Sequence, residues 1–352
     1  MRSKKHNVKL VLLVAVSQTL LACSAAQVAS TIEKPPVSEK TMHEETSSLH
    51  PDSWISEHIV DHPLVGTVWF GDGTRAGWSA LSNAVSEADF TLVGEIHTNP
   101  DHHLLQSKII DTIAVGGKKP VVVWEMIPAK NQAILDSLDL TTPESASTLG
   151  ATLDWDNSGW PSWSMYEPIA VTAVEHKLPM RGAALERTFL RELATNGTDE
   201  LSPELMTRLH LDEPLDQAAS ESMLDLLYEG HCELISRAAL KPMQSAQRAR
   251  DGAMADAMLS NPDSSQGAVL IAGNGHVRND WGVSAVLEKS LKTHSPNATV
   301  LSIAQIEVSE KHKQISGYTD FQSDPPIYDF IVFTPQSEIK DHCAELQKRF
   351  GS

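Results

Sequence analysis

The sequence predicts an α/β fold in which helices cover a mostly parallel sheet and a helical lobe is inserted into it. Short, continuous apolar runs alternate with helical patterns, which is typical of parallel strands that are buried on both faces. The segment from about 186 to 262 has only helical periodicity, which predicts the lobe. Apolar residues make up 41% and charged residues 21% of the 352 residues, which is a globular composition.

Each element follows from a local pattern. The predicted strands are the apolar runs 90–94, 120–124, 178–184, 268–272, 298–306 and 327–333. The predicted helices of the core are 101–114, 131–138, 166–176 and 282–292, and those of the lobe include 215–239 and 243–259. Asp101 is a plausible N-cap for the first of these helices, and Gly116-Gly117 ends it.

The N-terminus has the pattern of an export signal. A basic stretch precedes a largely apolar run, 10–22, which is too short to span a bilayer of about 30 Å. The run ends in Leu20-Leu21-Ala22-Cys23, which resembles the lipobox of bacterial lipoproteins. We therefore expect residues 1–22 to be a signal peptide and Cys23 to carry acyl chains such as palmitate. Residues 23–62 have no apolar period, so we expect a flexible tether.

The charge balance limits the partners. The first 22 residues hold four of the 28 cationic side chains and no acid, so the remainder carries 24 against 46 acids. Such an acidic surface argues against nucleic-acid binding, which needs clustered cations. We therefore expect contact with the membrane through the lipid anchor only. Cys232 and Cys343 could pair in an oxidising compartment, but the sequence leaves this open.

Polar side chains follow three of the predicted strands. Glu95 and His97 follow 90–94, Glu125 follows 120–124, and His276 follows 268–272. Each of the two histidines stands three residues after a glycine, which allows a close approach of the backbone. Because ligands of parallel sheets bind beyond the carboxyl ends of the strands, we expect the four side chains to converge there.

These residue types leave two functions open. As a metal-dependent hydrolase, the protein would use Glu95, His97, Glu125 and His276 to hold zinc or another divalent ion, which activates water. Glu95 with a histidine could also act as a general base without a metal. Alternatively, the same edge of the sheet is the ligand site of a binding protein, which needs affinity for its ligand but no catalysis. The spacing of these residues alone does not distinguish the hydrolase from the binding protein.

Several motifs together are similar to one known family. They are Gly94-Glu95-x-His97-x-Asn99-Pro100-x-His102-His103, Glu125-Met126, Trp160 through Tyr166-x-Pro168, His231-Cys232, Gln247-Arg248-Ala249-Arg250-Asp251, and Gly273-Asn274-Gly275-His276-Val277-Arg278. In this order, over about 88–290, they resemble the ChaN family of haem-binding, iron-regulated bacterial lipoproteins. The wider superfamily includes Tiki-type metalloproteases and erythromycin esterases. The resemblance implies an α/β core with helical additions.

The resemblance also implies a function. It favours a non-catalytic haem-binding lipoprotein in haem or iron uptake or trafficking, anchored in the cell envelope at the outer membrane and facing the periplasm. It implies a tyrosine ligand for the haem iron, which we carry over onto Tyr166, and haem bound at a homodimer interface. The other candidate haem contacts are His97, His276, Trp160, Trp163 and Arg278. Arg248 and Arg250 are further candidates for pairing with the haem propionates.

Overall fold

A seven-stranded sheet forms the centre of the protein. The computed structural model describes residues 48–142, 144–261, 263, 266–339 and 342–350. The strand order is β1-β7-β6-β2-β5-β3-β4, and all neighbouring strands are parallel except β1 and β7. The predicted α/β class with a mostly parallel sheet is therefore confirmed.

The strands begin and end close to the predicted positions. They are β1 (Val68–Phe70), β2 (Phe90–Glu95), β3 (Val121–Pro128), β4 (Met180–Ala184), β5 (Ala268–Gly273), β6 (Val300–Glu307) and β7 (Phe330–Thr334). Strand β1 was not predicted, because three residues at the sheet edge are too short to show a pattern. In the central strands β2 and β5 every residue is buried, which explains their continuous apolar runs.

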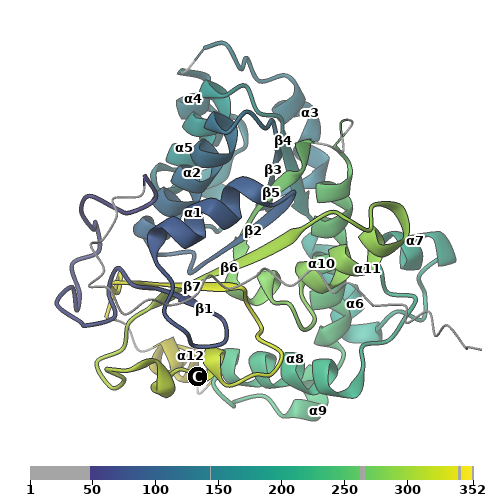
Figure 1. Ribbon diagram of the computed structural model, residues 1–352. Helices are drawn as coiled ribbons and strands as arrows, with labels where there is room; N and C mark the ends of the chain where they lie inside the picture. The colour runs from purple at the N-terminus through teal and green to yellow at the C-terminus, as the bar shows by residue number, and fades with distance from the viewer. Residues whose placement is uncertain (1–47, 143, 262, 264–265, 340–341, 351–352) are drawn as a thin grey trace, which may run out of the picture. The chain divides into compact units, whose positions relative to one another are not determined.

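Helices cover both faces of the sheet (Figure 1). One face packs against α1 (Trp78–Glu87), α2 (Pro100–Val115) and α5 (Trp163–Glu175). The other packs against α10 (Met243–Leu259) and α11 (Val283–His294). Buried leucine, isoleucine and methionine side chains fill both layers, and each contributes about 1.5–3 kcal/mol by leaving water. The remaining helices α3 (Gln132–Asp136), α4 (Glu144–Thr152) and α12 (His342–Phe350) lie outside the lobe.

The segment between β4 and β5 is helical where the structure describes it, as predicted. It contains α6 (Arg187–Asn196), α7 (Pro203–Arg208), α8 (Gln217–Gly230), α9 (Arg237–Leu240) and α10. The single helix predicted over 215–239 is wrong, because Cys232 and Glu233 adopt left-handed backbone angles (φ 54° and 60°) that end α8. Helix α10 also differs from the prediction, because it leaves the lobe and packs against the sheet through Met254 and Met258.

The predicted tether does not extend to residue 62. Residues 1–47, including Cys23, lie outside the described residues. Residues 48–62, in contrast, pack on the domain: Leu49 is fully buried, and the backbone N–H groups of Ile55 and Ser56 donate to the Asp101 carboxylate at 2.7 and 2.9 Å. Asp101 is therefore not the N-cap of α2. That role belongs to Asn99, whose side chain accepts from the Asp101 N–H at 2.9 Å.

A disulfide joins Cys232 to Cys343, with Cα atoms 5.4 Å apart. It links the end of α8 to α12, although 111 residues separate the two cysteines in sequence. Helix α12 lies beside α8 (Figure 1). Among the described residues, no helix is both long and apolar enough to cross a membrane.

Candidate functional site

The carboxyl ends of three neighbouring strands form the site. Strand β5 lies between β2 and β3, and Glu95 at the end of β2 pairs in register with Gly273 at the end of β5. On the other side, the Gly273 N–H donates to Oε2 of Glu125 at 2.7 Å. Parallel pairing of β2, β5 and β3 thus places both glutamates at one edge of the sheet, and both are almost completely buried.

His276 lies on one side of Glu125. Its Nε2 is 3.3 Å from Oε1 of Glu125, and its Nδ1 is 2.5 Å from Oδ1 of Asp251. Helix α10 contributes this aspartate and two more contacts, because Arg250 pairs with Glu125 and the Gln247 amide lies 3.0 Å from Nδ1 of His276. The histidine therefore has contacts on both ring nitrogens, and 6% of its side chain is exposed.

Charge pairing sets the protonation states around Glu125. Burial alone would raise the pKa of Glu125, but attraction and hydrogen bonding to His276, with further attraction to Arg250 and His97, hold this pKa well below its usual range. Burial lowers the pKa of His276, and the nearby Arg250 cation also lowers it. Attraction to Glu125 and Asp251 outweighs both effects, so the pKa of His276 rises to about 9. His276 is therefore an imidazolium at neutral pH and Glu125 is a carboxylate.

His97 forms a second cluster with Glu95. Its Nδ1 is 2.6 Å from Oε1 of Glu95, and 32% of its side chain is exposed. The Tyr166 hydroxyl donates to the same carboxylate oxygen at 3.0 Å, and Nδ1 of His103 lies 3.1 Å from the other oxygen. The Trp160 ring meets the His97 ring edge-on, with centroids 4.8 Å apart.

The protonation states of this second cluster follow the same physics. Burial raises the pKa of Glu95, but His103 and His97 together hold it well below its usual range. The pKa of His103 is raised because attraction and hydrogen bonding to Glu95 outweigh burial. Burial first, and then Glu95, raise the pKa of Tyr166 far above its usual value. Tyr166 is consequently a neutral phenol that donates to a carboxylate.

Two glycines allow the clusters to meet. A Cβ atom at Gly94 would lie 2.3 Å from Oδ1 of Asn274, so only glycine lets the loop after β5 pack against β2. A Cβ atom at Gly273 would lie 3.1 Å from Nε2 of His97 and 3.7 Å from Oε2 of Glu125. The structure thus brings Glu95, His97, Glu125 and His276 together at the sheet edge.

Two of the expected haem contacts lie in the core instead. Tyr166 has no exposed surface, and its hydroxyl is engaged with Glu95, so it does not fit the expected role of iron ligand in this conformation. Trp163 is 8% exposed and packs against Trp124 and Trp155 with ring centroids 6.2 and 4.9 Å apart. Trp163 therefore belongs to the hydrophobic core between α5 and the sheet, where its large aromatic ring is buried.

Two of the three candidate arginines form their contacts with residues outside the site. Arg278 binds Asp280 and Ser222 and lies over the Trp281 ring, which differs from its expected role as a haem contact. Arg248 donates to the backbone carbonyls of His210 and Glu213. Arg250 alone of the three reaches the site, and 32% of its side chain is exposed.

The donor set does not fit the zinc alternative. Among the described residues, no group of three or more His, Cys, Asp or Glu side chains is arranged to hold a metal ion. The physical reason is that the expected ligands pair with one another and with Arg250, whose cation binds the Glu125 carboxylate.

Sequence reasoning missed several residues of the site. Asp251 and Gln247 were part of a motif without a role, and His103 was not assigned to the site. Gln247, Arg250 and Asp251 have i, i+3 and i+4 spacing, so they share one face of α10, and this spacing was the available signal. His102 has a different role, because its Nδ1 accepts from the Ile96 N–H at 2.8 Å and fixes the loop that carries His97.

A family model described as "Haem-binding uptake, Tiki superfamily, ChaN" matches residues 81–287, more than half of the chain. The chain belongs to this family. The matched range includes both clusters of the site, from Glu95 to His276. A comparison with curated protein sequences gave no match.

One solved structure has a similar fold. This ChaN-family chain is similar to a Campylobacter jejuni structure titled "Cofacial heme binding to ChaN", with 18% identity and a TM-score of 0.57, over 75% of this chain and 95% of that one. An erythromycin esterase in its open conformation has 14% identity and a TM-score of 0.41, over 76% and 95% of the two chains. The type III effector HopBA1 has 11% identity and a TM-score of 0.36, over 73% and 92%.

Proposed function

We propose that this protein binds haem at the carboxyl edge of its sheet and acts in haem or iron uptake or trafficking without turnover. Membership in a haem-binding family carries this proposal, because the matched range contains the whole site. The Campylobacter jejuni ChaN structure, which has the same fold, is described as binding haem cofacially. We extend that binding to the present chain.

The exposed side chains of the site fit a haem group. When bound, haem supplies an iron that accepts a protein ligand and two propionates that accept hydrogen bonds from cations. His97 offers a partly exposed imidazole, and Trp160 beside it offers an apolar surface for a flat ring. Arg250, which is also partly exposed, offers a guanidinium for a propionate.

The place of action is part of the same proposal. The lipobox-like sequence at Cys23 supports an acyl anchor in the bacterial envelope, at the outer membrane and facing the periplasm. The disulfide between Cys232 and Cys343 is compatible with an oxidising compartment outside the cytoplasm. We further propose that two copies associate around haem, as expected for the family.

Titration of the full-length protein with hemin tests this function. We expect a Soret band that saturates at a fixed stoichiometry. Replacing Arg250 with Leu should weaken binding by removing the cation, whereas Arg191→Leu, an exposed arginine on α6, should leave binding unchanged. A spectrum that rises without saturation, or equal binding by heat-denatured protein, would contradict the proposal.

A further inference from the structure

A partly buried arginine on β4, Arg181, has no partner for its charge. Among the described residues, its guanidinium forms no hydrogen bond or ion pair, and its Nε atom is buried without a hydrogen-bond partner. The other partly buried arginines that the structure describes all bind carboxylates or backbone carbonyls; they are Arg237, Arg248, Arg250 and Arg278. Because a buried charge without a partner costs free energy, the exception points to an anion that the protein binds.

Arg181 lies on the face of the sheet that α10 covers. Side chains two residues apart on a strand share a face, and Ala183 packs in the same hydrophobic cluster as Met254 and Met258 of α10. Helix α10 also packs against β4 and α7. Arg181 is therefore located between the edge strand of the sheet and the helical lobe.

A cavity of about 280 Å³ lies at this junction, and Arg181 lines it. Arg208, at the end of α7, lines the same cavity, and its guanidinium also has no hydrogen bond or ion pair among the described residues. Of the described residues that line the cavity, Asp256 of α10 is the one acid. The cavity thus has a net positive charge, carried by two guanidinium groups that no carboxylate binds.

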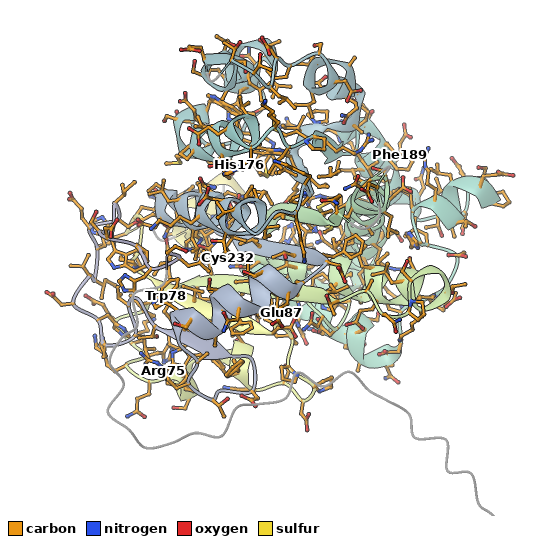
Figure 2. The ribbon with its side chains drawn as sticks, turned by 45° about the horizontal axis from the view of Figure 1, so that its top comes forward. Arg75, Trp78, Glu87, His176, Phe189 and Cys232 are labelled. Carbon is orange, nitrogen blue, oxygen red and sulfur yellow. A yellow bond between two sulfur atoms is a disulfide. The ribbon has the colours of Figure 1, made fainter. Side chains whose placement is uncertain are left out.

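The rest of the lining is mostly small and apolar. Leu185 and Ala253 pack against the small hydrophobic core of the lobe, as does Phe189 of α6 (Figure 2). The side-chain amide of Gln132 is already hydrogen-bonded within the domain through both its oxygen and its nitrogen. An anion in this cavity would therefore take its hydrogen bonds from the two arginines.

A second, larger cavity extends the space. It has a volume of about 920 Å³ and shares Arg208 and Asp256 with the first cavity. Its lining includes the apolar side chains of Met258 and Leu259. A molecule whose anionic group contacts Arg181 and Arg208 consequently has room for an organic body beyond Arg208.

We infer that the smaller cavity binds the phosphate group of a small organic phosphate ester, with Arg181 and Arg208 as the cations that bind it. A planar guanidinium donates to phosphate oxygens in pairs, and two such groups suit the three terminal oxygens of a phosphate monoester. A carboxylate offers only two oxygens and satisfies a single guanidinium.

This site is separate from the proposed haem site. None of the described residues that line the smaller cavity belongs to the clusters around Glu95 and Glu125. On α10, the cavity residues Ala253 and Asp256 follow Arg250 and Asp251, which contact the haem site. The inference therefore does not depend on the proposed haem function.

Calorimetric titration of the full-length protein with inorganic phosphate and with hexyl phosphate tests the inference, at constant ionic strength because salt screens charges. We expect saturable binding of both, and tighter binding of the ester because its alkyl chain buries apolar surface in the larger cavity. Arg181→Leu and Arg208→Leu should each weaken binding about tenfold or more, because each removes a charged donor. Arg191→Leu, which removes an exposed arginine of α6, is the matched control and should bind like wild type.

Thermal unfolding gives a second measurement. Phosphate should raise the melting temperature of wild type and leave that of Arg181→Leu unchanged, because a ligand stabilises only a folded state that binds it. Without phosphate, Arg181→Leu should be at least as stable as wild type, since it removes a partly buried charge without a partner. If Arg181→Leu does not fold, Arg208→Leu decides the test, because Arg208 is exposed.

Several outcomes would overturn the inference. Wild-type protein without saturable binding of either phosphate would do so, as would Arg181→Leu or Arg208→Leu protein that binds hexyl phosphate like wild type. Hexanoate that binds as tightly as hexyl phosphate would contradict the assignment of a phosphate group. Hemin binding by Arg181→Leu should equal that of wild type, and wild-type protein that binds phosphate but not hemin would overturn the proposed function alone.

Discussion

Nδ1 of His276 and Oδ1 of Asp251 lie 2.5 Å apart and join helix α10 to the turn after β5. Both side chains are almost completely buried, and the other oxygen of Asp251 has no hydrogen-bond partner among the described residues. This contact, with the Arg250–Glu125 pair one residue earlier on α10, fixes the helix to the site. The stability of the domain therefore depends on the charges of the site.

Asp251→Ala should destabilise the protein by about 3–5 kcal/mol, because it removes one partner of a buried charge pair. Chemical denaturation followed by circular dichroism measures this change. The control is Glu186→Ala, which breaks an exposed pair with Lys130 and should change stability little. Equal losses of stability from the two substitutions would contradict the prediction that the buried pair stabilises the protein more than the exposed pair does.

Loss of the disulfide should also lower stability. Replacing both Cys232 and Cys343 with Ser opens a loop of 111 residues and should cost about 2–5 kcal/mol. Thermal unfolding with and without dithiothreitol checks this, since the reductant should lower the melting temperature of wild type and leave that of the double variant unchanged. A wild-type melting temperature that does not respond, with the thiols shown to be reduced, would refute the prediction.

Asp329 should make the stability depend on pH. Burial raises the pKa of Asp329 to about 6, against the hydrogen bonds from Ser302 and Asn279 that lower it. The folded state then holds a proton that the unfolded state has released, so this contribution is complete below about pH 4 and is lost as the pH rises through 6. The loss is on the order of 2–3 kcal/mol.

Asp329→Asn removes this titration. Denaturation curves of wild type and variant between pH 4 and 7 give the comparison, and the difference in their free energies of unfolding should change most between about pH 4 and pH 6 and level off above pH 6. A constant difference over this range would mean that Asp329 titrates normally.

Cys23→Ala should release the protein from membranes, because an acyl anchor needs the thiol of this residue. Fractionation of cells that express the wild type or the variant measures the distribution. Cys343→Ser serves as the control for removal of a cysteine outside the signal region and should remain in the membrane fraction. Membrane retention of the Cys23 variant would contradict the lipid anchor.

The sequence alone determined six of the seven strands, their order along the chain and the edge of the sheet at which the four candidate side chains meet. The strands β2 and β5 are buried on both faces and must be continuously apolar, so their positions and the polar residues after them are visible without a structure. The alternation of such runs with helices also predicted the fold class. Local patterns failed where tertiary contacts decided the outcome, as at the left-handed turn that ends α8.

Only the tertiary structure decided which of the candidate side chains are accessible. The family resemblance places the iron ligand at Tyr166 and His97 among the other haem contacts, but packing of α5 buries Tyr166 and leaves His97 partly exposed. Likewise, the role of Asp251 depends on α10 crossing the sheet beside β5, which no local pattern contains. The physical reason is that burial, hydrogen-bond partners and charge pairing arise between segments far apart in sequence, whereas periodicity records only which face of an element is apolar.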